Sequence, residues 1–462
     1  MKKIIFIMVV FLLCSALAGC NRNTSDKVGI GQNGVSENEK ENEIHQIENM
    51  EILCDSKHLA SCYTENGYYY LSEYAVELKN GTYGTHLMYM DFATKQEIYL
   101  CSNTGCKHDT EDCPAVFSMD KFPMYSTGIF VYDNKLFVLS KEMDDEGVVA
   151  QDLSIHMENE MMETEASQAI LYQMNLDGTN RQKIYTFDPG IIVEDVVLGN
   201  QDGLYFVTKK LSSEMAKDTY SITTATDKKL LFLDVTSKKA KEVVSLDFHD
   251  GITWKILGCF ENTLVMSGVD YGTELTMDAY IDDDAWKELY KHSNDIISVL
   301  DLNTKKRKEV YRMDNTRAHS TVIMEDMLYV SYQDTGEIFS INLLSSEEKL
   351  LCTLPQNYIM EKFENTLCCC SWDSTSDYTY YFVNVETGEM QNSPLVNKTL
   401  GWSLEFQAEI GSQVLLIYDY EADALGDGAY EITQYKYALI EKEDLYAGNA
   451  DYHPIKMIGK GN

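Results

Sequence analysis

A pair of hairpin patterns repeats along the chain and restricts the fold more than any other feature of the sequence. In one hairpin, an apolar strand ends in Asp or Asn, and a short turn rich in Thr, Gly or Lys leads into the next strand. Asp301, Asn342 and Asn384 mark this strand end at intervals of 41 and 42 residues. A second hairpin precedes each of these, and its segment Phe-Glu-Asn-Thr-Leu occurs twice, at 260–264 and 363–367. Two hairpins give four strands per unit.

Units of four short antiparallel strands, repeated about every 40 to 45 residues, are typical of a β-propeller. A single four-stranded sheet cannot bury both faces until neighbouring sheets stack around a ring. Seven units fit the chain, so we expect an all-β fold, a seven-bladed β-propeller of four-stranded antiparallel blades. We expect Glu51–Cys54 to close the ring beside His453–Ile458, which would remove the exposed strand edges. A short surface helix is expected at 282–291.

The N-terminal segment carries an export signal. Lys2 and Lys3 precede an apolar run from Ile4 to Cys14, and small residues follow. A run this short is typical of a secretory signal, because a membrane-spanning helix needs about 20 apolar residues. The end of the segment, Leu-Ala-Gly-Cys20, resembles the lipobox of bacterial lipoproteins. The resemblance implies cleavage before Cys20, a diacylglyceryl group on its sulfur, and anchoring in the lipid bilayer on the extracytoplasmic face of the cell membrane.

Amino-acid composition separates a polar tether from the part of the chain that can fold. Residues 21–49 are polar and contain no aromatic residue, so they cannot bury enough apolar surface to fold, and we expect a flexible tether. The predicted parts are a signal peptide at 1–20, the tether at 21–49, the propeller at 50–462, a Cys/His linker at 101–117, and acidic insertions near 143–168 and 271–295.

The formal net charge of the chain is −36. Such a charge repels the phosphate backbone, so we expect no nucleic acid as a partner. It favours cations and basic partners instead.

The stretch CSNTGCKHDTEDCPA at 101–115 combines three cysteines and a histidine. Cys101, Cys106, His108 and Cys113 form a complete tetrahedral Cys₃His set, which is typical of structural zinc, and zinc is the ligand that we favour. A disulfide remains an alternative, because thiols oxidise in exported proteins and the spacing lacks the paired C-x₂-C knuckle. A catalytic thiol is a third interpretation, with His108 as the nearby base.

The other cysteines follow the strand pattern. Residues 368–370 are three consecutive cysteines in the strand that contains the second Phe-Glu-Asn-Thr-Leu segment. Adjacent strand residues point to opposite faces, so we expect packed strand residues and no convergent ligand set. Cys259 and Cys352 also fall in strand patterns, whereas Cys54 and Cys62 flank a short segment before the first unit and could form a disulfide.

One hairpin adds a resemblance to known propellers. The YQMNLDGTN segment at 172–180 resembles hairpins of TolB-type and low-density-lipoprotein-receptor-type propellers. With the lipobox, the tether and the Cys/His linker, the chain is similar to a family of Gram-positive bacterial lipoproteins that carry such a propeller domain of unknown function. The resemblance implies a fold and a location, and little chemistry.

Known catalytic signatures are missing from the sequence. It contains no G-x-S-x-G elbow, no HExxH motif, no P-loop and no dinucleotide fingerprint. We therefore expect a non-enzymatic module that binds a protein or a small ligand. The alternative is an extracytoplasmic hydrolase or lyase acting on a glycan or peptide, because a propeller can assemble a site from separate blades without any local motif.

Overall fold

The computed structural model describes residues 46–119, 121–122, 126–140, 168–216, 220–273, 283–372, 378–426 and 429–457. The predicted signal peptide with Cys20, nearly all of the tether and nearly all of the 143–168 insertion lie outside these residues. Within the described part of the chain, no helix is long and apolar enough to cross a membrane.

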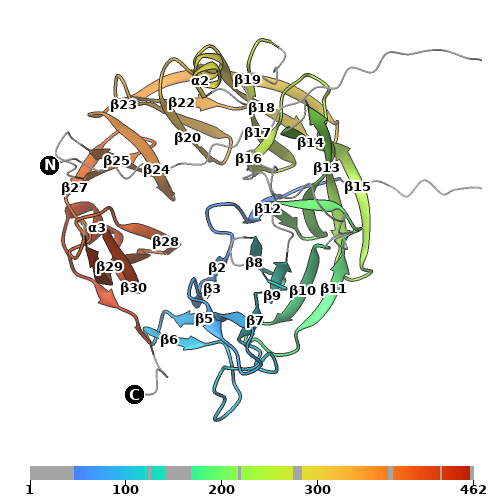
Figure 1. Cartoon of the computed structure of the whole chain (residues 1–462). Helices are drawn as coiled ribbons and strands as arrows, with labels where there is room; N and C mark the ends of the chain where they lie inside the picture. The colour runs from blue at the N-terminus through green and yellow to red at the C-terminus, as the bar shows by residue number, and fades with distance from the viewer. Residues whose placement is uncertain are drawn as a thin grey trace, which may run out of the picture.

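The strands form sheets that stand around a central axis (Figure 1). Six sheets contain four consecutive antiparallel strands, and the first strand of each lies nearest the axis (Figure 1). The first three of these sheets comprise β8 (Thr127–Tyr132), β9 (Lys135–Ser140), β10 (Ile170–Asn175) and β11 (Gln182–Thr186); β12 (Ile191–Asn200), β13 (Gly203–Ala216), β14 (Tyr220–Asp234) and β15 (Lys239–Ser245); and β16 (Lys255–Phe260), β17 (Thr263–Asp270), β18 (Asn294–Asp301) and β19 (Lys306–Asp314).

The other three follow in chain order. They comprise β20 (His319–Met324), β21 (Met327–Tyr332), β22 (Glu337–Asn342) and β23 (Glu348–Thr353); β24 (Asn357–Phe363), β25 (Thr366–Trp372), β26 (Tyr378–Asn384) and β27 (Met390–Ser393); and β28 (Glu405–Ile410), β29 (Gln413–Gly426), β30 (Ala429–Glu441) and β31 (His453–Pro454).

The sheet nearest the N-terminus does not have this form. Its main strands are β2 (Ser61–Thr64), β3 (Gly67–Leu71), β5 (Tyr83–Asp91) and β6 (Gln96–Tyr99). Strand β5 has nine residues, and its early part pairs with β4 (Val76–Glu77) and β7 (Val116–Ser118) instead of β3. With β32 (Lys456–Met457) this sheet has seven strands, one of them parallel. The prediction of seven four-stranded antiparallel blades is therefore wrong: six sheets are built on that unit, and the long β5 recruits additional strands into the remaining one.

The predicted ring closure is also wrong. Strand β1 (Glu51–Cys54) pairs with β12, and Gly199 lies opposite Glu51. A Cβ at Gly199 would lie 2.6 Å from Leu53 Cδ1, so the missing side chain makes room for β1. The C-terminal segment instead joins the last sheet to the first, because β31 pairs with β30 and β32 pairs with β6.

Two helices accompany the sheets in the described part of the chain. Helix α2 (Asp283–Lys291) confirms the helix expected at 282–291, and α3 (Lys442–Ala447) connects β30 to β31. The strand positions expected for the cysteines are confirmed as well. Cys368, Cys369 and Cys370 lie fully buried in β25, while Cys259 and Cys352 lie in β16 and β23.

The C-terminal bridge generates a prediction about stability. A chain that ends at Tyr452 loses β31, β32 and Ile455, which packs with Met90 and Leu439 between the first and last sheets. We expect its free energy of unfolding to fall by about 1 kcal/mol or more, as measured by urea denaturation, since fully burying an aliphatic side chain is worth about 1.5 to 3 kcal/mol and Ile455 is partly buried. A chain that ends at Met457 keeps both strands and is the control. Equal denaturation midpoints for the two chains would contradict the bridge.

Candidate functional site

A cavity of about 860 Å³ lies at the axis of the ring. The wall of the cavity includes one equivalent residue from each of five inner strands. In β2, β8, β20, β24 and β28 this is the second-to-last residue of the strand. These residues are Tyr63, Val131, Ile323, Lys362 and Glu409. The repeat therefore places equivalent positions around one space.

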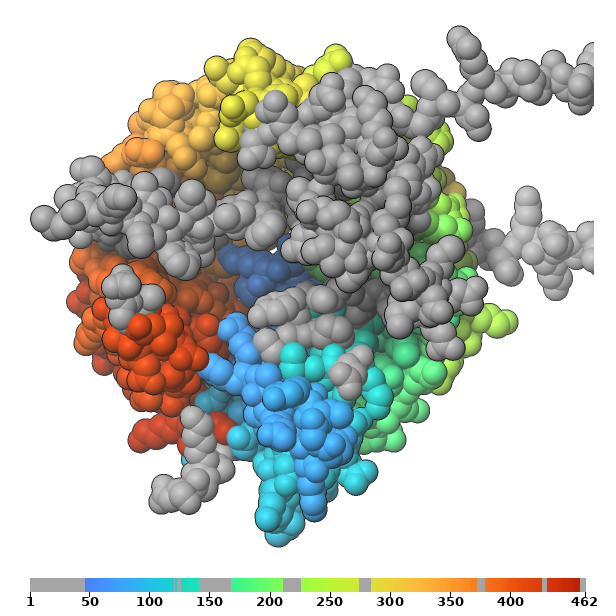
Figure 2. Space-filling model, viewed as in Figure 1, coloured from blue at the N-terminus to red at the C-terminus, as the bar shows by residue number. Residues whose placement is uncertain are grey.

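The segment between β1 and β2 supplies a further part of the wall. In Figure 1 it lies in the middle of the ring, and the earliest described residues, in dark blue, are visible there in Figure 2. It contributes Asp55, Lys57 and His58 to the cavity. The backbone N–H groups of Lys57 and His58 each donate to Asp55 Oδ1 at 2.9 Å, so this carboxylate organises the turn.

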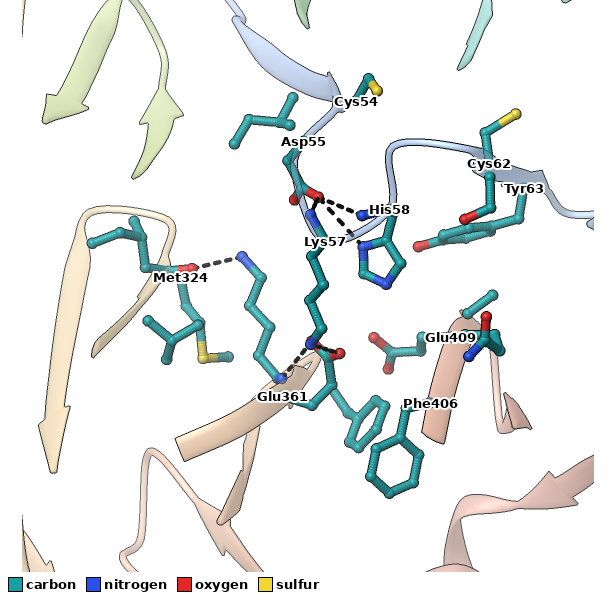
Figure 3. A pocket seen from close by; sticks show the side chains of 18 of the residues that line it. Cys54, Asp55, Lys57, His58, Cys62, Tyr63, Met324, Glu361, Phe406 and Glu409 are labelled. Atoms are coloured by element: carbon teal, nitrogen blue, oxygen red, sulfur yellow. Dashed lines mark hydrogen bonds and ion pairs between the residues drawn. The ribbon is translucent and has the colours of Figure 1, made fainter. Parts of the chain in front are cut away.

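Two pairs of charged groups lie on one side of the cavity (Figure 3). The Lys57 ammonium group forms an ion pair with Glu361, and His58 Nδ1 lies 3.6 Å from Asp55 Oδ1. The Lys57 side chain is 48% exposed and that of Glu361 is 16% exposed, so solvent weakens this pair and its main effect is to fix the two side chains in place.

A second group of contacts fixes the far wall. Lys362 Nζ donates to the carbonyl oxygen of Ile323 at 2.6 Å, and burial lowers the pKa of Lys362. Glu409 forms an ion pair with Lys442 and accepts a hydrogen bond from the backbone N–H of Glu364 at 3.1 Å. The cavity thus presents both signs of charge on constrained side chains.

Two pKa shifts define the charge state at the axis. Burial acts to raise the pKa of Asp55, but hydrogen bonds from His58 outweigh burial, and the pKa is lowered. Burial raises the pKa of Tyr63, and the nearby Glu409 and Glu361 carboxylates raise it further. At neutral pH Asp55 is therefore an anion and Tyr63 a neutral hydroxyl.

The Cys/His linker forms a second candidate site, at the rim. The ligand atoms of Cys101, Cys106, His108 and Cys113 all lie within 4.8 Å of one another. A tetrahedral zinc ion with Zn–S bonds of about 2.3 Å places its ligands about 3.8 Å apart. The four residues fit such an ion without any large movement of the backbone.

The turn at His108 shapes this cluster. Gly105 and His108 have φ values of 73° and 55°, which bend the chain back on itself. The His108 N–H donates to Cys106 Sγ at 3.4 Å, and His108 Nδ1 lies 3.2 Å from Cys113 Sγ. His86 Nε2 lies 2.8 Å from the His108 carbonyl oxygen, and the Tyr99 ring stacks on the imidazole at 4.3 Å between centroids. The His86 contact holds the His108 backbone, and the Tyr99 ring restricts the orientation of the His108 imidazole.

The pKa values of the cluster residues are shifted in different directions. The His108 backbone hydrogen bond lowers the pKa of Cys106, whereas burial raises the pKa of Cys113 to about 12. Burial also lowers the pKa of His108, which favours the neutral imidazole that a metal requires. A cation would have to displace the proton of Cys113, so its binding becomes stronger as the pH rises.

The disulfide alternatives have no counterpart among the described residues. No disulfide joins Cys101, Cys106 and Cys113 to one another, and none joins Cys54 to Cys62. Cys62 is buried, which raises its pKa well above the ordinary thiol value. The structure does not form the Cys54–Cys62 disulfide that the sequence left open.

The sequence interpretation found one of the two sites. It identified the four cluster residues, which the structure brings together, while Cys20 lies outside the described residues. It missed the axial cavity. Alignment of the repeats could have identified part of it, because Glu361 and Lys362 directly precede the second Phe-Glu-Asn-Thr-Leu segment.

Comparison with known proteins finds similarity only at the level of solved structures. No protein-family model matches the chain, and no curated protein sequence matches it. TolB from Acinetobacter baumannii is 11% identical, with a TM-score of 0.31, over 82% of this chain and 77% of that chain. Oligogalacturonate lyase from Vibrio parahaemolyticus is 10% identical, with a TM-score of 0.40, over 63% and 74%.

Puromycin hydrolase is 8% identical, with a TM-score of 0.47, over 89% of this chain and 55% of that chain. The chain therefore spans about half the length of puromycin hydrolase. The fold assigned above depends on the strand pairing and not on these similarities.

Proposed function

We propose that the protein is a lipid-anchored, extracytoplasmic binding module without enzymatic activity, and that it holds its ligand in the axial cavity. The observation that carries the proposal is the convergence of constrained charged side chains from β24, β28 and the β1–β2 segment on one space of about 860 Å³. This volume lies within the range of about 300 to 1,000 Å³ that is usual for small-molecule sites.

The ion pairs support binding more than catalysis. Lys57 with Glu361 and Asp55 with His58 hold each other in place, so the cavity is organised before a ligand arrives. Such preorganisation lowers the entropy that binding costs. The alternative of a hydrolase or lyase acting on a glycan or peptide is not adopted, because these same pairs already explain the placement of the charged groups without a reacting substrate.

The location is proposed from the sequence. The Leu-Ala-Gly-Cys20 end of the signal segment supports a diacylglyceryl anchor of the Gram-positive lipoprotein type, and two acyl chains suffice for stable membrane attachment. The propeller would then stand outside the cell membrane, and its ligand would be an extracytoplasmic small molecule or protein segment.

Zinc is the metal that we propose for the cluster of Cys101, Cys106, His108 and Cys113. The donor set supports it, since three thiolates and one imidazole complete a closed tetrahedral site of structural type. When bound, zinc would cross-link the linker within residues 101–113 and would contribute to folding rather than to a reaction.

Filling the axial cavity tests the binding role. Leu257 lines the cavity and is 37% exposed, so Leu257→Trp adds bulk without disturbing the core. Compounds from a library of metabolites, dipeptides and sugars that raise the melting temperature of the wild type should lose this effect in Leu257→Trp. The control is Leu350→Trp on the outer strand β23, where the side chain is 47% exposed. An unchanged shift in Leu257→Trp would place the ligand elsewhere and contradict the proposal.

Metal analysis tests the zinc site. We expect one zinc ion per chain by mass spectrometry, its loss in His108→Ala, and a lower melting temperature, because structural zinc contributes on the order of 10 kcal/mol to the folding of its module. His249→Ala is the control, since the His249 side chain is 86% exposed and lies outside the cluster. Metal-free protein with a reducible bridge among Cys101, Cys106 and Cys113 would contradict the site.

Metabolic labelling tests the anchor. Cells expressing Cys20→Ser should incorporate no labelled palmitate into the protein, which would be released or left unprocessed, because lipid on Cys20 is the proposed attachment. Cys14→Ser, in the apolar run of the signal, should remain labelled. Palmitate on the Cys20→Ser protein would show that the anchor lies elsewhere.

A further inference from the structure

A second pocket, of about 380 Å³, lies where the first and last sheets meet. Its wall includes Tyr68 and Tyr70 of β3 and Tyr435 and Tyr437 of β30. Residues two apart on a strand share one face, so each strand presents a pair of tyrosines to the same side. The sequence analysis did not single out these Tyr-x-Tyr pairs.

The tyrosines form one continuous aromatic wall. Ring centroids lie 5.7 Å apart for Tyr68 and Tyr70, 5.8 Å for Tyr70 and Tyr437, 6.5 Å for Tyr437 and Tyr435, and 6.2 Å for Tyr435 and Tyr74. The last three pairs are tilted by 44°, 51° and 42°, so the rings form a curved wall and not a flat platform. A sugar ring stacks on a flat platform, whereas a compact cation is surrounded well by tilted rings.

Carboxylates lie among these rings. The Tyr435 hydroxyl donates to Glu73 Oε2 at 2.9 Å, and the Tyr70 hydroxyl donates to Glu97. Burial raises the pKa of Tyr74 to about 12, and burial also raises the pKa values of Tyr70 and Tyr435, so these groups remain neutral donors. A neutral donor stabilises a carboxylate but does not cancel its charge. The wall therefore combines electron-rich ring faces with negative charge.

The lysine that lines this pocket is engaged in the axial cavity. Lys57 lines both spaces, and its ammonium group forms its ion pair with Glu361 on the axial side. The chain as a whole carries a net charge of −36, which raises the local concentration of cations at its surface.

We propose that the tyrosine pocket binds a small organic cation, an ammonium compound whose charged group lies against the tyrosine rings beside Glu73. Ring faces attract cations through their quadrupole, most effectively when several rings surround a weakly hydrated ammonium group. This inference names a ligand class for a second site and rests on the binding role proposed above.

Calorimetry with choline as the probe tests the proposal, on the full chain purified in nonionic detergent. Choline should bind, and its neutral analogue 3,3-dimethyl-1-butanol, which has the same shape without the charge, should not. Tyr74 is 39% exposed at the pocket, so its substitution should leave the fold intact. Tyr74→Leu should weaken choline binding about threefold to thirtyfold, whereas Tyr74→Phe, which keeps the ring, should bind as the wild type does.

A second variant keeps the test independent of Tyr74. Glu73→Gln preserves the size of the side chain and should weaken binding about fivefold. Equal binding of choline and its neutral analogue, or no binding of choline at millimolar concentration, would overturn the cation site. Choline binding that is lost in Leu257→Trp but unaffected by Tyr74→Leu would also overturn it, while leaving the axial binding role intact.

Discussion

Apolar packing between neighbouring sheets is the interaction on which the rest of this structure depends. Each sheet has two faces rich in aliphatic and aromatic residues, and it can bury both only when a sheet stands on either side. Between the last and first sheets, Leu415 and Leu439 pack against Tyr68 and Met90. This contact requires the last sheet to lie beside the first. The short strands β31 and β32 hold the two sheets together, because β31 pairs with β30 and β32 pairs with β6.

The sequence predicted structural features that depend on residues within one repeat unit, and it missed strand pairings between segments that are far apart in the chain. Hairpins at intervals of 41 and 42 residues, the helix at 282–291 and the strand positions of the β25 cysteines all depend on patterns within one unit. The form of the N-terminal sheet depends on pairing between β5 and β7, and the closure depends on β32 meeting β6. Neither follows from a repeat pattern, because each arises where the chain departs from the repeat.

The two candidate sites show the same division. The cluster of Cys101, Cys106, His108 and Cys113 lies within thirteen residues, so its spacing alone could indicate a metal site. The axial cavity joins Lys57 to Glu361, which are 304 residues apart. Its penultimate strand positions could be aligned in advance, but Asp55, Lys57 and His58 come from a segment outside the repeat, and only the closed ring brings them to the axis.

The geometry also makes the two adjoining pockets dependent on each other. They share Lys57, His58 and Tyr68, and the Lys57 ammonium group is held toward Glu361. A cation seated against the tyrosine wall repels that ammonium group and so favours its pair with Glu361. A ligand in the axial cavity that competes for Glu361 would instead release Lys57 toward the wall and weaken cation binding. Because coupling between two sites is reciprocal, each ligand must then oppose the other by the same factor.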